Sequence, residues 1–390
     1  MNVLFVTYDF PYPTTSGGKN RAYHLLKYAA KEANITLFSF VREDYNPDSN
    51  EELNKLGINK IFVTKRKKLK SASNIPLTII RNFSIFKTLY YEKAVLEELQ
   101  KIIHDEKITL VHFESSYTGF YIGKELKKMD VKIILGTENI EHMLYYDYAK
   151  SLKKFYLRPF INYQAKRLKH EEIEMMRGSD RVTVITDDEK DILKRNFGIE
   201  SEIVANGIEP ESFSYAFSEK KRNNILFVGN FTYFPNTDAF EFFYKEVFPK
   251  IDTKTTITVI GKQVSLKFKN TDKRIIKKDF VEDIIAEYRN ADMLIFPIRI
   301  GGGTNFKVLE AMSLGVPIIA NPARLSGLRA KSDIHFLPAV GADEYVAQIA
   351  KLEADGALRK KLSINARKLI EEYYAWNKIG KELLRIWKSQ

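Results

Sequence analysis

Cysteine is absent from the 390-residue chain, which excludes disulfide frameworks, zinc–thiolate sites, iron–sulfur clusters and catalysis by a thiol. No run of about 18 or more apolar residues occurs, so no membrane-spanning helix is expected. The opening apolar run Met1–Tyr8 lacks a basic flank before it and a small-residue cleavage site after it. It is more typical of a strand than of a signal peptide, and we expect a cytoplasmic protein.

Two ligand-binding motifs are also missing. Neither Val6–Tyr8 nor Phe227–Val228, which end the first strands of the two halves, is followed by Gly-x-Gly-x-x-Gly, and this argues against a dehydrogenase. No Asp-x-Asp occurs anywhere, so a diphosphate held through a chelated metal is not expected. We predict no metal site and no cofactor.

The residues that are present describe a folded protein with a basic surface. Hydrophobic residues make up 44% of the chain and charged residues 29%, which is typical of globular proteins. Lysine and arginine number 62 against 50 acidic residues, giving a net charge of +12. Such a balance favours anionic partners such as phosphates, nucleic acid or an acidic membrane.

Strand-like and helix-like segments alternate along the chain in two series, which predicts an α/β protein with two parallel-sheet domains of roughly 200 residues each. Lys19–Ala33 has the helical spacing of apolar residues, and Ala339–Gln390 is expected to be helical throughout. The first series of strands is Asn2–Tyr8, Ile35–Val41, Ile61–Thr64, Leu110–Phe113, Lys132–Gly136 and Arg181–Thr186. The second is Asn224–Val228, Thr256–Ile260, Asp292–Ile298, Val316–Ala320 and Ile334–Leu337.

The most informative segment is the glycine-rich stretch Phe296–Ala320. It predicts a strand, a glycine loop (Gly301, Gly302, Gly303), a short helix capped by Thr304 and ended by Gly315, and a second strand. Lys307 would lie in the first helical turn, where a cation is unfavourable unless an anion is bound. Lys307 and Glu310 lie on one helix face, and we interpret the segment as an anion site with Glu310 placed for ribose hydroxyls. It is not a P-loop, because no Gly-Lys-Ser/Thr follows.

This stretch resembles the nucleotide-sugar signature of retaining GT-B glycosyltransferases of family 4 in Lys307–Met312 and Gly315–Ala320. The resemblance extends over nearly the whole chain. Further matching segments are Ser16–Gly18, Asp180–Thr186, Val204–Ile208, Phe227–Asn230, Phe234–Asp238 and Ala375–Ile386.

The resemblance implies a GT-B architecture, in which two Rossmann-like domains face each other across a cleft. Residues 1–205 would form the acceptor-binding domain, 206–222 the linker, 223–370 the nucleotide-sugar domain and 371–390 a helix crossing back to the first domain. The residues implied in catalysis are Lys307, Glu310 and Glu114. Those implied in donor binding are Gly18, Gly229, Asn230, Gly301, Gly302, Gly303, Thr304, Asn305, Lys307 and Glu310. Gly17, His112, Glu138 and His142 would lie on the acceptor side.

The sequence departs from the family pattern at three points. The first carboxylate of the family's Glu-x7-Glu pair is Gly302 here, with Glu310 as the second member. Asn230 and Asn236 stand where many members carry an arginine and a lysine, which leaves Lys307 as the main cation for the diphosphate. His112 lies two residues before the position at which many members have a histidine, near Glu114, and is more typical of a core histidine.

The implied reaction moves a sugar from a UDP- or GDP-sugar to a glycan or lipid-linked acceptor without a metal, retaining the anomeric configuration by front-face attack. Lys307 and loop N–H groups would stabilise the leaving β-phosphate, which would help to deprotonate the acceptor. The expected setting is the synthesis of cell-surface polysaccharide or glycolipid. Two alternatives stay open: a nucleotide-sugar epimerase on the same fold, and a non-catalytic partner subunit.

Basic residues gather at Lys65–Lys70 and in Lys150–Lys169, where they alternate with large apolar side chains. That mixture suits peripheral contact with anionic lipid at the inner face of the membrane, and a solvated basic surface is the alternative interpretation. No recognised nucleic-acid-binding module occurs, so nucleic acid is not an expected partner.

Overall fold

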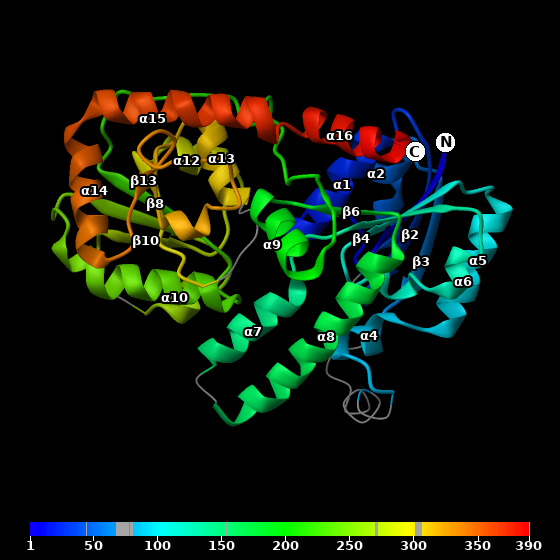
Figure 1. The fold of residues 1–390 in the computed structure, drawn as a ribbon. Coiled ribbons are helices and arrows are strands. Elements are labelled where there is room, and N and C mark those ends of the chain that lie inside the picture. Colours follow the sequence, from blue (N-terminus) through cyan, green and yellow to red (C-terminus); the bar gives the residue numbers. More distant parts are fainter. Residues whose placement is uncertain are drawn as a thin grey trace. The chain divides into compact units, whose positions relative to one another are not determined.

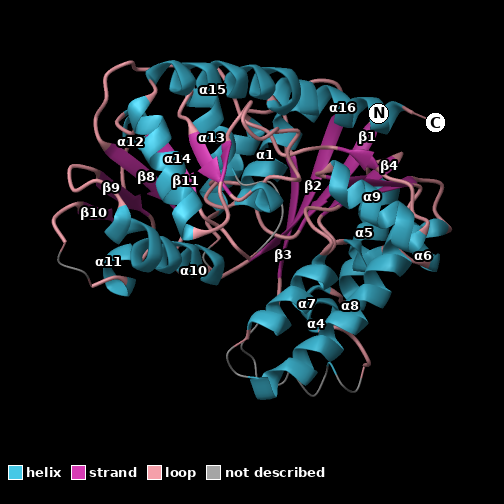
Figure 2. Ribbon diagram, turned by 60° about the vertical axis from the view of Figure 1, so that its left-hand side comes forward, coloured by secondary structure: helices cyan, strands magenta, loops and turns pink. Residues whose placement is uncertain are grey.

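The computed structural model describes residues 1–43, 45–67, 78, 81–152, 155–269, 272–300 and 306–389. Its chain divides into two compact units, Met1–Asn206 with Trp376–Gln390, and Gly207–Ala375. Both units are parallel sheets covered by helices (Figures 1 and 2), as the sequence predicts.

The first unit contains a seven-stranded sheet in the order β3-β2-β1-β4-β5-β6-β7. Its strands are β1 (Asn2–Thr7), β2 (Asn34–Val41), β3 (Lys60–Lys65), β4 (Leu110–Glu114), β5 (Lys132–Gly136), β6 (Arg181–Val184) and β7 (Glu202–Ile203). Its helices are α1 (Gly17–Ala29), α2 (Asn50–Asn54), α4 (Ile85–Tyr90), α5 (Lys93–Asp105), α6 (Lys124–Lys127), α7 (Glu141–Ser151), α8 (Arg158–Gly178), α9 (Asp187–Phe197) and α16 (Trp376–Lys388).

The buried apolar runs of these strands explain the two-sided cover of this sheet, because successive side chains point to opposite faces. On one face, Leu4 and Val6 belong to the core that includes Leu99 of α5 and Leu168 of α8. On the other face, Phe5 stacks on His112 of the neighbouring strand, with ring centroids 4.7 Å apart. Helix α16 packs against α1 in this unit.

The second unit contains a six-stranded sheet in the order β10-β9-β8-β11-β12-β13. Its strands are β8 (Asn224–Val228), β9 (Thr256–Ile260), β10 (Ile275–Lys278), β11 (Met293–Phe296), β12 (Ile318–Ala320) and β13 (Leu337–Pro338). Its helices are α10 (Phe234–Phe242), α11 (Val264–Lys267), α12 (Ile284–Arg289), α13 (Phe306–Leu314), α14 (Ala342–Ala354) and α15 (Gly356–Leu369).

Local signals in the sequence shape two helix ends in the structure, and the helix stop at Gly315 is as predicted. Gly315 follows α13 with a φ of 82°, a conformation that glycine adopts without strain. Thr186 caps α9 by accepting a hydrogen bond from the N–H of Glu189 at 3.1 Å, and Glu189 Oε2 accepts from the N–H of Ile185 at 3.2 Å. This arrangement is similar to a capping box, except that Glu189 accepts from the residue before the N-cap, and the acidic residues after Thr186 begin α9.

Other boundaries were predicted wrongly. Helix α1 begins at Gly17, two residues before the predicted start, so the glycines of Ser16–Gly18 lie in its first turn. The tail is not one helix: α15 restarts at Asp355, whose side chain accepts from the N–H of Leu358 at 2.8 Å, and a further break falls at Ala375. Strands β7 and β10 were missed, because they are edge strands that are short or half polar.

Candidate functional site

In the second unit, Lys307 reaches the carboxyl end of strand β8. Its Nζ donates hydrogen bonds to the carbonyl oxygen of Val228 at 2.9 Å and to Asn236 Oδ1 at 2.8 Å. Burial lowers the pKa of Lys307 to about 8, against an opposing effect from the charge of Glu310. Ligands of open α/β sheets bind at this edge of the sheet, and here the cation contacts neutral oxygens through both hydrogen bonds.

Glu310, one turn further along α13, is held by Tyr288. The Tyr288 hydroxyl donates to Glu310 Oε2 at 2.8 Å, and it lies 3.1 Å from the carbonyl oxygen of Lys307. Burial raises the pKa of Glu310, while the hydrogen bond from Tyr288 and the charge of Lys307 lower it in part. Tyr288 is therefore a positioning residue that the sequence did not reveal, because it lies on α12 with no motif around it.

The loop after β8 is shaped by close backbone contacts. A Cβ atom at Gly229 would lie 2.9 Å from the Asn236 side chain, which donates through Nδ2 to the carbonyl oxygen of Asn230 at 2.9 Å. Asn230 Oδ1 accepts from the backbone N–H of Thr232, also at 2.9 Å. Gly229 and Asn236 thus place the Lys307 ammonium, whereas the Asn230 side chain forms a local turn.

A second cation lies at the carboxyl end of β11. Arg299 pairs with Asp238 of α10 through two hydrogen bonds of 3.0 and 2.7 Å. The expected donor residues Gly301, Gly302, Gly303, Thr304 and Asn305 lie outside the described residues. Arg299 was not singled out from the sequence, although it lies only two residues before Gly301.

In the first unit, Glu114 is the last residue of β4 and is only 1% exposed. Arg21 of α1 donates from Nε to Glu114 Oε1 at 2.6 Å, and from Nη1 to the carbonyl oxygen of Val204 at 2.7 Å. Burial alone would raise the pKa of Glu114, but the charge of Arg21 and the hydrogen bond from His112 lower it to about 2. Glu114 is therefore a buried structural anion paired within the first unit and not a solvated loop carboxylate. The burial of Glu114 does not favour its predicted role toward the substrate.

His112 is the core histidine that its strand position predicted. It is fully buried, and the indole N–H of Trp387 lies 3.2 Å from its Nδ1. Because the indole can only donate, Nδ1 accepts, and the proton on Nε2 is donated to Glu114 Oε2 at 2.8 Å. His112 therefore holds Glu114 in place through this hydrogen bond.

Gly17 and Gly18 form the start of α1 beside Tyr8 and Glu138. A Cβ at Gly18 would lie 1.9 Å from the Tyr8 hydroxyl and 3.0 Å from Glu138 Oε1. That buried oxygen makes no hydrogen bond with the described residues. Burial, together with the charge of Glu114, raises the pKa of Glu138 to about 7. Glu138 follows β5, so a carboxyl group with one unbonded oxygen and a raised pKa lies at the carboxyl edge of this sheet.

His142 takes part in the internal structure of the first unit. It is 4% exposed, and its Nδ1 lies 2.7 Å from Glu172 Oε2. Glu172 also accepts from the backbone N–H groups of Glu141 and His142, at 3.0 and 2.9 Å, which fixes the start of α7. Of the residues expected on the acceptor side, Glu138 alone combines a location at the sheet edge with an unused oxygen.

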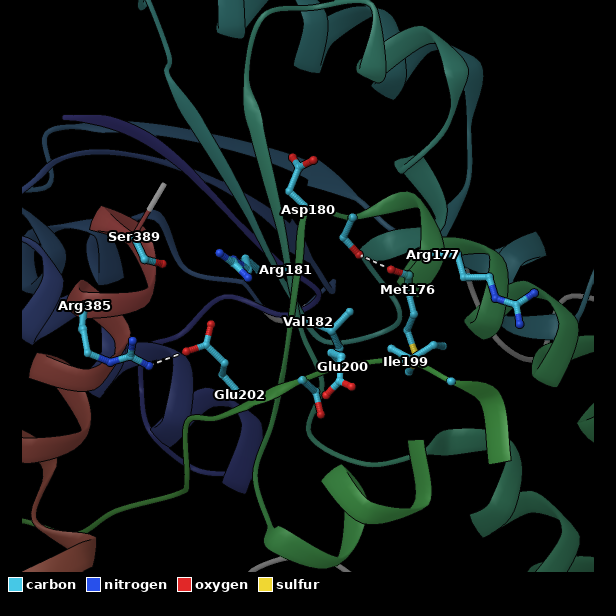
Figure 3. A pocket seen from close by; sticks show the side chains of 13 residues that line it. Met176, Arg177, Asp180, Arg181, Val182, Ile199, Glu200, Glu202, Arg385 and Ser389 are labelled. Carbon is cyan, nitrogen blue, oxygen red and sulfur yellow. Dashed lines mark hydrogen bonds and ion pairs between the residues drawn. The ribbon is translucent and has the colours of Figure 1, made fainter. Parts of the chain in front are cut away.

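A separate hollow of about 490 Å³ lies in the first unit at the opposite, amino end of β6 (Figure 3). Its charged lining residues are of both signs, and Arg385 pairs there with Glu202. Lining side chains include Arg177, Asp180, Arg181, Glu200, Glu202 and Arg385. This mixed lining, away from the carboxyl edge, does not form part of the candidate site.

Two kinds of feature are absent from the part of the chain that the structure describes. No group of three or more histidine and carboxylate side chains is placed to hold a metal ion in that part of the chain. None of the described helices combines the length and the apolar character needed to cross a bilayer.

Comparison with known families decides the identity. Residues 15–212 match the family described as Glycosyltransferase Family 4, and residues 222–355 match Glycosyl transferases group 1. The chain is a group 1 glycosyltransferase of family 4. The resemblance in its motifs is thereby confirmed as to family and to the GT-B type of glycosyltransferase.

Individual proteins that are similar to this chain support the assignment of its family. An uncharacterized glycosyltransferase of Methanocaldococcus jannaschii is 23% identical over 341 residues, covering 81% of each chain. Sucrose-phosphate synthase from Thermosynechococcus elongatus is similar in structure, with a TM-score of 0.76 at 14% identity over 100% of this chain and 98% of that one. HepE of Anabaena, solved in complex with UDP, has a TM-score of 0.69 at 11% identity over 100% of both chains. The structural likenesses show the fold.

Proposed function

We propose that this glycosyltransferase takes its sugar from a nucleoside-diphosphate donor held at Lys307. The proposal rests on the surroundings of the Lys307 ammonium. This group is partly buried, and its hydrogen bonds go only to neutral oxygens. Its lowered pKa means that the charge is poorly compensated there, and a bound diphosphate would supply the missing negative charge. The UDP bound to the Anabaena protein supports a uridine nucleotide as the first donor to test.

In the proposed reaction, the bond between the anomeric carbon and the β-phosphate oxygen breaks, and a bond from an acceptor hydroxyl to the same carbon forms. The acceptor proton passes to the departing phosphate, and the configuration is retained. Lys307 stabilises the charge that develops on the β-phosphate, as preorganised donors do in other transferases. Glu310, fixed by Tyr288, accepts hydrogen bonds from the ribose hydroxyls, and no metal is required.

The proposed acceptor is a hydroxyl group of a glycan or lipid-linked glycan, used in polysaccharide or glycolipid synthesis. Glu138 would bind it, because its buried Oε1 lacks a hydrogen-bond donor among the described residues and a sugar hydroxyl can supply one. The neighbouring Gly18 leaves room, since any side chain there would meet Tyr8 and Glu138. Glu138 acts here as a positioning group for the acceptor.

A thermal-shift panel tests the donor proposal. Wild-type protein, Lys307→Ala and the exposed-lysine control Lys351→Ala are each heated with UDP, GDP, ADP, TDP, CMP and the corresponding sugars. A ligand at about 100 times its Kd adds about 2.7 kcal/mol, which is enough to raise Tm by several degrees. We expect one nucleoside diphosphate to stabilise wild type and Lys351→Ala but not Lys307→Ala.

Other outcomes separate the alternatives. Absence of a shift with every nucleotide would contradict the donor proposal and favour a non-catalytic partner, an interpretation that Gly302 keeps open. If the donor is bound, incubation without acceptor followed by sugar analysis distinguishes the activities. Isomerised sugar in that reaction would identify an epimerase.

A further inference from the structure

We propose that the hairpin of α7 and α8 is a membrane-docking surface for anionic lipid bilayers. The two helices lie side by side and extend away from the sheet of the first unit (Figures 1 and 2). The docking surface is defined here by Lys150, Phe155, Tyr156, Leu157, Arg158, Phe160, Tyr163 and Lys166. It rests on features independent of the donor site.

Aromatic side chains are exposed where the hairpin turns. Phe155 is 73% exposed and Tyr156 is 64% exposed, and their rings meet edge to face with centroids 6.2 Å apart. Phe160, at the start of α8, is 38% exposed. An isolated exposed apolar residue is ordinary, but a contiguous group of large ones marks a surface that binds something.

The start of α8 differs from the rest of that helix. Its buried residues begin at Gln164 and continue to Met176, facing the body of the unit. The preceding turns contain no buried residue, although they include Phe160 and Tyr163. A helix end that is surrounded by solvent is normally polar all round, so these side chains lack the apolar partner that their composition requires.

Charge selects the partner. Residues 148–170 contain no aspartate or glutamate, and exposed cations flank the aromatic group at Lys150, Arg158 and Lys166. The acidic residue facing this group is Asp147, which pairs with Lys150 at 3.1 Å. Aromatic side chains inserted at the headgroup level beside lysine and arginine are the pattern of peripheral proteins on acidic bilayers. A second copy of this chain would meet the same positive charge and be repelled.

The position of the surface also suits a lipid-linked acceptor. Helix α7 begins at Glu141, three residues after Glu138, and continues to Ser151 near the aromatic group. Eleven residues of helix span about 16 Å, so the hairpin separates the acceptor-side carboxylate from the bilayer by roughly that distance.

Vesicle sedimentation tests the proposal with the full chain. Wild type is mixed with vesicles of phosphatidylcholine alone and with vesicles containing phosphatidylglycerol. One variant carries Phe155→Ser and Tyr156→Ser, and a second carries Arg158→Gln and Lys166→Gln. Matched controls are Leu266→Ser, which replaces a side chain 65% exposed in the second unit, and the pair Lys101→Gln and Lys124→Gln.

We expect wild type and both controls to sediment with anionic vesicles and not with neutral ones. Loss of two cations should weaken binding about thirtyfold, and loss of the two aromatic rings at least about tenfold. An unchanged circular dichroism spectrum and an unchanged Tm would show that the variants are folded.

Failure of wild type to bind anionic vesicles would overturn the proposal, as would equal binding to neutral vesicles or binding that the hairpin variants leave unchanged. A concentration-dependent dimer that disappears in the Phe155→Ser, Tyr156→Ser variant would also overturn it, in favour of self-association. None of these outcomes depends on whether Lys307 binds a donor.

Discussion

Two cations withdrawn from solvent have different surroundings: Arg21, buried in the first unit, and Lys307, partly buried in the second. Arg21 is fully buried and contacts an anion, Glu114, as well as the carbonyl oxygen of Val204. Lys307 makes its hydrogen bonds to neutral oxygens, and the pKa of Lys307 is lowered as a result of burial. Arg21 is thus paired with an anion inside the fold, whereas the Lys307 ammonium contacts no anion through its hydrogen bonds.

Replacing Arg21 should produce the largest effect. Arg21→Gln leaves Glu114 buried without its ion-pair partner, and we expect a loss of about 3–5 kcal/mol in the free energy of unfolding. Urea unfolding followed by tryptophan fluorescence measures it, since Trp376 and Trp387 both lie in the first unit. The double variant Arg21→Met, Glu114→Met should regain much of the loss; equal instability of both variants would contradict the pairing argument.

The contribution of this pair should also depend on pH. The pKa of folded Glu114 is about 2, below its ordinary value of 4.5, so its stabilising effect is complete above about pH 4.5 and is lost as pH falls toward 2. Wild type should lose stability over that interval more steeply than Arg21→Met, Glu114→Met.

Replacing Lys307 should affect binding more than folding. Lys307→Ala removes a charge-assisted contact to the diphosphate, for which we expect a loss of about 2–3 kcal/mol in donor binding, or roughly a hundredfold in Kd. Its free energy of unfolding should stay the same or rise slightly, because a partly buried charge is removed. Calorimetric titration and urea unfolding check both expectations, and marked destabilisation would mean that Lys307 is structural like Arg21.

Donor affinity should fall in alkaline solution. The free-protein pKa of Lys307 is about 8, and a bound diphosphate would raise it. Affinity should therefore be complete below about pH 8 and decrease up to about tenfold per unit above it. Titrations from pH 6.5 to 9.5 in buffers of different ionisation enthalpy would detect the proton uptake, and a flat profile would contradict the role of Lys307.

Replacing Glu138 should give the smallest effect, confined to the reaction with the acceptor substrate. Glu138→Gln keeps the shape of the side chain but makes it a weaker hydrogen-bond acceptor for a hydroxyl of the acceptor substrate. We expect kcat/KM for the acceptor substrate to fall about tenfold without a change in the Kd of the nucleotide sugar. The wild-type rate should increase as pH rises through about 7, because the pKa of Glu138 is raised to that value. Glu138→Gln should lack this limb, while Glu189→Gln, at a capping carboxylate, should keep it.

The sequence was sufficient for features that depend on neighbouring residues. The apolar runs predicted most of the strands in both sheets, and the spacing of Lys307 and Glu310 placed them three residues apart on one helix, α13. The motifs also predicted the family correctly. These signals succeed because strand alternation, helix periodicity and capping involve residues at most a few positions apart.

Tertiary structure alone decided which charged groups are paired. Arg21 meets Glu114 across 93 positions, and Trp387 fixes the proton of His112 across 275. Glu138 and Glu114 each follow or end a strand with similar local sequence signals, yet one pKa is raised to about 7 and the other lowered to about 2. Burial and the distance to other charges set these values, and both depend on how segments far apart in the chain pack together.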